Sequence, residues 1–142
     1  MTGAATPGLT ICSRAQAMRW LLFFATNVYE GENRMVHPEW YTSEPDCTNA
    51  VNQFAVEYVN RHFLLFEEIL TGGPYLLGER FSLVDIYVWM LIQWHRDLNW
   101  LETNCPKILK LVRAVMSRPK IEPVHLENIG PGIGLGLGLT TV

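Results

Sequence analysis

Three cysteines and four histidines are the side chains of this chain best suited to nucleophilic, redox or metal chemistry. Cys12, Cys47 and Cys105 are odd in number and lack Cys-x-x-Cys spacing. They indicate reduced thiols and not a disulfide framework. Cys12 lies near Arg14 and is a candidate reactive thiol, although an inert cysteine is the commoner case.

The histidines share no metal-ligand spacing, and none belongs to a recognisable nucleophile–His–acid arrangement. The sequence therefore predicts no metal site and no catalytic residue in this chain. The four positions are His37, His62, His95 and His125.

The most specific local pattern is a helix start, not a catalytic motif. Ser82 lies three residues before Asp85, so each side chain can satisfy an unpaired backbone N–H of the first helical turn. Gly78 allows the chain to turn sharply just upstream. Ser82 and Asp85 are therefore predicted to form a capping box with a structural role.

Helical periodicity extends over most of the chain, and no segment alternates with the period of a strand. The first helix is expected to end near Gly31, before a loop over 32–42. Ser43 and Asp46 repeat the Ser-x-x-Asp spacing at the start of the longest helix. The sequence predicts an all-α bundle of about five helices, with helices over about 14–29, 43–71, 83–97 and 106–117 and a short last helix after residue 119.

The composition indicates one domain with a sizeable core. The chain has 142 residues, of which 49% are hydrophobic and 18% charged. A formal net charge of −3 argues against a nucleic-acid partner. The apolar runs 20–25 and 86–92 fall short of the roughly 20 residues that a membrane span needs. We therefore expect a cytoplasmic protein with no nucleic-acid and no membrane partner.

The ends of the chain differ from its middle. Residues 1–13 are small or turn-forming and predict a linker or tail, and the helical domain is expected over 14–128. Glycine at every second position disfavours helix in the Gly/Leu-rich segment 129–142, which is predicted to be a disordered tail. The segments 20–25 and 83–94 are apolar on almost every helical face, so contact with another chain is expected.

The segment around the capping box resembles the glutathione S-transferases. Gly78-x-x-Phe81-Ser82-x-Val84-Asp85-x-Tyr87, preceded by Tyr75-Leu76-Leu77, looks like the capping-box segment of their all-helical C-terminal domain. The segment 13–21 is similar to the first helix of that domain, and 106–119 to a later helix and its end. Trp94 matches a tryptophan of bacterial beta-like members.

The resemblance implies a set of site residues. Tyr29, Trp94, Met18, Phe24 and Met90 would line the pocket for an apolar co-substrate, and Asn27 would reach toward glutathione. The same side chains are also common as ordinary core or helix-end residues. The implied function is therefore co-substrate binding and dimerisation, and not activation of the thiol.

The family's glutathione site and thiol-activating residue lie in a thioredoxin-like domain, which this chain is not expected to contain. The chain is expected to be inactive alone, as a fragment, truncated gene product or split enzyme. No cofactor is expected in it, and glutathione would be a co-substrate only beside a thioredoxin-like partner chain. Expected partners are that chain or a second copy, together with an apolar electrophile. The alternative is a non-catalytic helical module for protein interaction.

Overall fold

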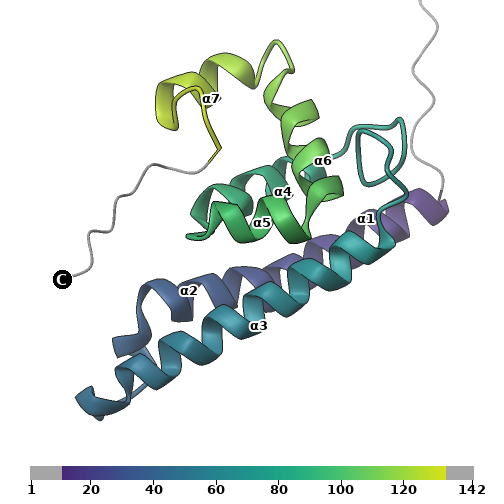
Figure 1. Cartoon of the computed structure of the whole chain (residues 1–142). Coiled ribbons are helices and arrows are strands. Elements are labelled where there is room, and N and C mark those ends of the chain that lie inside the picture. Colours follow the sequence, from purple (N-terminus) through teal and green to yellow (C-terminus); the bar gives the residue numbers. More distant parts are fainter. Residues whose placement is uncertain (1–10, 134–142) are drawn as a thin grey trace, which may run out of the picture.

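The described residues, 11–133, are almost entirely helical in this computed structural model, and no strand occurs among them (Figure 1). The all-α prediction is therefore confirmed. The α-helices are α1 (Ile11–Phe23), α2 (Glu30–Val36), α3 (Thr48–Ile69), α4 (Leu83–Trp94), α5 (Leu98–Asn104), α6 (Pro106–Met116) and α7 (Glu122–Asn128). A π-helix η1 (Phe24–Tyr29) and two 3-10 turns, η2 (Pro38–Trp40) and η3 (Pro45–Cys47), complete the list.

The helices form two layers with α7 beyond them (Figure 1). In the first layer, α1, η1 and α2 join into one helical rod over 11–36, which lies along α3. The second layer consists of α4, α5 and α6. The buried cluster between the layers holds large apolar side chains, including Phe24, Phe63, Phe66, Leu91, Leu101 and Ile108.

The helical rod does not end near Gly31, so that prediction is wrong, and 32–36 is helix instead of loop. A Cβ on Gly31 would lie 2.6 Å from the Val59 Cγ2 atom of α3. Gly31 is present because α2 and α3 approach closely here, and not because the chain turns. A local reading of glycine as a helix end missed this packing requirement.

The π-helix η1 interrupts the rod at Phe24–Tyr29 without breaking it. Polar side chains support the wider turn. The Thr26 hydroxyl donates to the Leu22 carbonyl at 2.8 Å, and the Asn27 amide donates to the Phe23 carbonyl at 3.0 Å. Single π turns inside α-helices often occur at functional sites, and η1 contains three of the residues predicted to bind ligands.

Two predicted helix boundaries need correction. Ser43 and Asp46 do not cap the long helix, because η3 precedes α3 and neither start has a side-chain cap. The third predicted helix stops at Trp94 instead of 97. A separate helix, α5, follows it, and the Asp97 carboxylate accepts the Trp100 amide at 2.8 Å at the start of α5.

The capping box at the start of α4 is present as predicted. One oxygen of the fully buried Asp85 accepts the Leu76 amide at 2.7 Å. The other accepts the Ser82 amide at 2.7 Å and the Ser82 hydroxyl at 2.8 Å. Burial raises the pKa of Asp85, and these hydrogen bonds oppose the rise. The preceding turn places Gly78 at φ +74°, where glycine is favoured.

A long-range contact caps α6. Cys105, at the N-cap position, makes no side-chain cap. Instead, the Glu67 carboxylate of α3 accepts the Lys107 amide and the Ile108 amide, both at 2.9 Å. Glu67 of α3 thus satisfies two unpaired N–H groups in the first turn of α6. Its negative charge also interacts favourably with the positive N-terminal end of the α6 dipole.

We expect Glu67→Gln to lower the free energy of unfolding by about 1 kcal/mol, since an amide keeps one acceptor but loses the charge. Urea denaturation followed by circular dichroism measures this. Glu68→Gln is the matched control, because Glu68 is exposed and adjacent on α3. Equal effects of the two substitutions would contradict the proposed cap.

The chain ends lie largely outside the described residues. The predicted linker over 1–13 is described only from Ile11, where α1 already begins. Of the predicted tail, residues 129–133 are described, and the buried His125 ring donates to the Gly132 carbonyl at 2.8 Å. No helix of residues 11–133 combines the length and hydrophobicity needed to cross a membrane.

Candidate functional site

A cluster of large side chains lies where η1 meets the outer face of α4. The rings of Tyr29 and Trp94 lie 5.7 Å apart at 49°. Tyr87, Met90 and Trp94 follow helical spacing along α4 and are all partly exposed. Burial raises the pKa of Tyr87, with further contributions from Tyr29 and Glu30, so Tyr87 lies near Tyr29. We call Tyr29, Tyr87, Met90 and Trp94 the aromatic wall.

Two of the predicted pocket residues are not part of this wall. Phe24 has no exposed surface, and its ring packs 4.7 Å from Phe66 and 6.5 Å from Tyr87. It supports the wall from the core, so its predicted lining role is corrected. Met18 is 58% exposed on α1, roughly 16 Å along the rod from Tyr29 at 1.5 Å per residue. Met18 therefore lies apart from the wall.

Asn27 has a structural position next to the wall. Its amide nitrogen donates to the Phe23 carbonyl and, at 3.1 Å, to the Thr26 hydroxyl. Its amide oxygen accepts the Tyr58 hydroxyl of α3 at 2.9 Å. Asn27 thus joins η1 to α3 and fixes the turn that carries Tyr29. A contact of Asn27 with glutathione stays a prediction.

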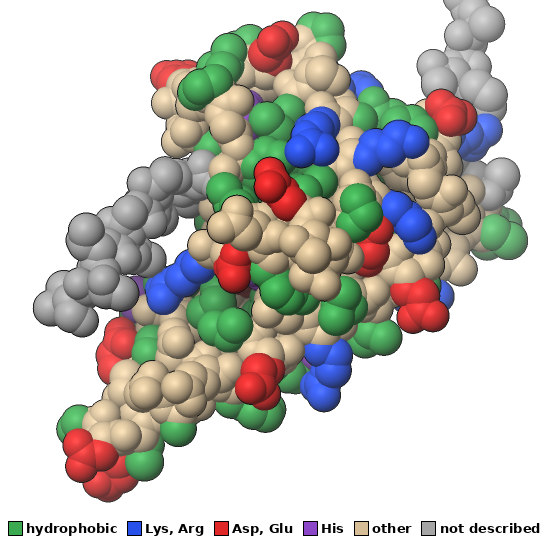
Figure 2. Space-filling model, viewed as in Figure 1, with side chains coloured by type: hydrophobic (Ala, Val, Ile, Leu, Met, Phe, Trp, Pro, Cys, Tyr) green, Lys and Arg blue, Asp and Glu red, His purple; other side chains and the backbone are tan. Residues whose placement is uncertain are grey.

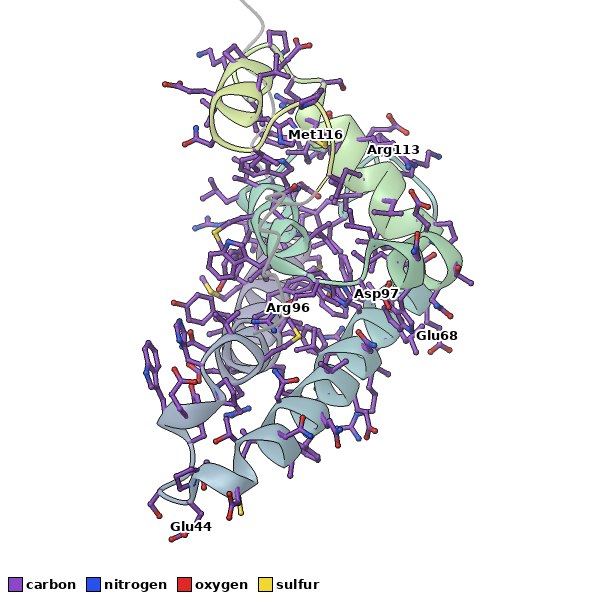
Figure 3. The ribbon with its side chains drawn as sticks, turned by 60° about the vertical axis from the view of Figure 1, so that its left-hand side comes forward. Glu44, Glu68, Arg96, Asp97, Arg113 and Met116 are labelled. Carbon is purple, nitrogen blue, oxygen red and sulfur yellow. The ribbon has the colours of Figure 1, made fainter. Side chains whose placement is uncertain are left out.

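One buried acid lies a helical turn beyond Tyr29. Glu32 is 1% exposed, and neither carboxyl oxygen has a hydrogen-bond partner among residues 11–133. Burial raises the pKa of Glu32 to about 8, and the positive charge of Arg96 opposes the rise. In Figure 3, Arg96 lies on the side of the α4–α5 connection nearer to α2, while Asp97 lies nearer to α3.

Two other buried titratable groups, His95 and Cys105, also have shifted pKa values. Burial lowers the pKa of His95 to about 4, so the ring is neutral, and its Nε2 atom donates to Asn60 at 2.8 Å. Burial, followed by the charge of Glu67, raises the pKa of Cys105 to about 12, so the thiol is not ionised. No group of three or more potential metal-ligating side chains occurs among residues 11–133.

Sequence reasoning therefore found the two residues in direct contact, Tyr29 and Trp94, and missed Tyr87 and Glu32. Tyr87 was visible in principle, since it precedes Met90 and Trp94 at three and seven positions. Glu32 follows Val28 and precedes Met35 on one helical face. This helical spacing was not used to predict the burial of Glu32, because residues 32–42 were expected to form a loop.

Comparison with known proteins identifies the family to which this domain belongs. A profile described as "Glutathione S-transferase, C-terminal domain" matches residues 32–124. The chain is 27% identical over 122 residues to the uncharacterized GST-like protein YncG of Escherichia coli (strain K12), which covers 86% of this chain and 58% of that protein. It is 28% identical over 132 residues to elongation factor 1-gamma of Trypanosoma cruzi, which covers 89% of this chain and 30% of that protein.

A crystal structure of a glutathione S-transferase from Actinobacillus pleuropneumoniae has the same fold. The TM-score is 0.64 at 20% sequence identity, over 96% of this chain and 59% of that one. The chain thus spans somewhat more than half the length of YncG and of the crystallised protein. Because the profile matches well over half of the chain, the protein belongs to the glutathione S-transferase family, and these residues form its C-terminal helical domain.

Proposed function

We propose that this domain provides the co-substrate wall of a glutathione S-transferase-like protein. The observation that carries the proposal is the partly exposed contact between Tyr29 and Trp94, which joins η1 and α4 in a surface of large rings. Such a surface suits an apolar electrophile or the apolar part of a glutathione conjugate. The proposal includes inactivity of this chain by itself, with glutathione bound only beside a thioredoxin-like unit.

The proposed partners are a second copy of the domain or a thioredoxin-like chain in the cytoplasm. Both layers carry exposed apolar side chains that are suited to such contacts. In the view of Figure 2, hydrophobic side chains lie between charged ones along α3. The most exposed apolar residues of α1 and α3 include Ile11, Met18, Leu22, Phe54, Leu65 and Ile69.

We expect an apolar glutathione conjugate, S-hexylglutathione, to bind about tenfold more weakly to Trp94→Ala, the loss expected for one aromatic contact. Titration calorimetry measures the dissociation constant in the presence of a thioredoxin-like domain from a related enzyme. Trp40→Ala is the matched control, because Trp40 is 66% exposed on η2 and stacks only on His37 among the described residues.

Equal losses in the two variants would exclude the aromatic wall as the binding surface. An activity assay of the isolated chain tests the proposed inactivity separately from the proposed binding role. Conjugation of glutathione to an electrophile by the isolated chain would overturn the proposed inactivity, whatever the binding result.

A second candidate function is that of a non-catalytic interaction module. The similarity to elongation factor 1-gamma favours it, since that protein's name places it among elongation factors. The exposed apolar side chains of α1 and α3 would then contact another protein. Stable association with a protein partner, together with no binding of S-hexylglutathione by the wild-type chain, would select this function over the first.

A further inference from the structure

Glu32 stands out among residues 11–133 because both of its carboxyl oxygens are buried and unpartnered. A buried carboxylate without a hydrogen bond or a counter-charge is strongly disfavoured. The side chain is therefore either neutral or in need of a partner when it ionises. Glu32 lies in α2, about one helical turn after Tyr29 of the aromatic wall.

Arg96 is the cation placed to meet that requirement. It is exposed, it follows the last residues of α4, and its charge acts on the Glu32 carboxyl although no ion pair joins them in this structure of residues 11–133. Arginine is well suited to a buried carboxylate because its guanidinium donates two parallel hydrogen bonds. Arg96 lies two residues after Trp94, which belongs to the aromatic wall.

The other charged and titratable groups on the surrounding elements do not replace Arg96. Among residues 11–133, Arg96 is the charged group that acts on the Glu32 carboxyl. His95 is held neutral by burial and bonds to Asn60, and Asp97 carries the same sign as Glu32 and caps α5. The remaining groups are Glu30 and Arg34 on α2, and Tyr58, Arg61 and His62 on α3.

We propose that Glu32 and Arg96 form a latch: when Glu32 ionises, Arg96 folds from solvent onto its carboxylate, and the resulting buried ion pair ties the end of α4, close to Trp94, to α2. Glu32 is thus a positioning residue for the aromatic wall and touches no ligand itself. The inference does not depend on the glutathione-related function, because it concerns the conformation of the wall alone.

The direction of the pH effect follows from the burial of Glu32. Its pKa is raised from 4.5 to about 8. A carboxyl with a raised pKa in the folded state stabilises the fold fully below the unfolded pKa, and this contribution is lost as the pH rises toward the folded pKa. For Glu32 the loss falls between about pH 4.5 and about pH 8. The latch is therefore open in acid and closes as the pH approaches the upper value.

The test is an NMR titration of the full chain from about pH 5 to about pH 10, a range above the ordinary pKa of carboxyl groups and below that of lysine. Carbon spectra follow the Glu32 carboxyl, and proton–nitrogen spectra follow the Trp94 indole. The Glu32 carboxyl signal is assigned with Glu32→Gln, and the Trp94 indole N–H signal with Trp94→Phe. In the wild type, we expect the Trp94 signal to move with the Glu32 midpoint. In Arg96→Gln, we expect that midpoint to rise by about one pH unit or more, and the Trp94 signal to stop following it.

Arg113→Gln is the matched control, since Arg113 is an exposed arginine on α6, far from Arg96 in Figure 3. It should leave both signals unchanged. An identical Glu32 midpoint in wild type and Arg96→Gln would overturn the latch. So would a Trp94 signal independent of Glu32, or a Glu32 carboxyl that does not titrate across the range.

Discussion

Replacement of Asp85 by alanine should lower the free energy of unfolding by about 4 kcal/mol, from two partly buried amides left unpaired at about 1–3 kcal/mol each and the loss of a helix cap. The amides are those of Leu76 and Ser82, and Asp85 itself has no exposed surface. The alanine side chain can accept neither bond. Urea denaturation at neutral pH measures the change.

Ser82→Ala is the control for this prediction. It removes the Ser82 hydroxyl, which donates to Asp85, but leaves both carboxylate–amide bonds in place. We expect a loss of about 1 kcal/mol, the usual value for an N-cap. If Asp85→Ala costs no more than Ser82→Ala, the link between Asp85 and the Leu76 amide contributes nothing to stability.

Gly31→Ala should cost about 2 kcal/mol, although alanine is a better helix former than glycine by about 1 kcal/mol. The added Cβ would lie 2.6 Å from Val59 Cγ2 and 3.2 Å from Tyr58 Cδ1. Val59 is fully buried and cannot move aside easily. The helical rod and α3 would have to separate, and thermal unfolding would report a lower melting temperature.

A double-mutant cycle with Val59→Ala identifies the cause. Val59→Ala removes the Cγ2 atom that the new methyl group would meet, so Gly31→Ala should become much less harmful in that background. Additive effects of the two substitutions would show that the close approach at Gly31 is not the source of the loss. A gain in stability from Gly31→Ala alone would show the same.

The parts of the fold predicted correctly are those that depend on neighbouring residues. The start of α4 is fixed by Ser82 and Asp85, three positions apart, and both partners of the capping box are visible in the sequence. Gly31 was misread because its reason lies on α3, in Val59. The start of α6 likewise depends on Glu67, which is 40 residues from Lys107.

In the candidate site, too, the features that depend on packing between distant residues were the ones predicted wrongly or missed. The resemblance supplied Tyr29 and Trp94, which the structure brings into contact. It also supplied Phe24, yet the π turn and the packing of Phe66 direct that ring into the core. A helical wheel drawn with a constant 3.6 residues per turn does not describe a rod with an inserted π turn. Glu32 was missed for a different reason, because its burial depends on helix packing.

The Glu67 contact has a consequence for the order in which the chain can fold. The first turn of α6 lacks a local cap, and its Lys107 and Ile108 amides are satisfied only once the end of α3 is in place. Nucleation of a short helix is costly, so an unsupported start delays its formation. We therefore expect residues 97–128 not to fold as an autonomous unit, and α6 to reach its full stability only when the two halves of the domain meet.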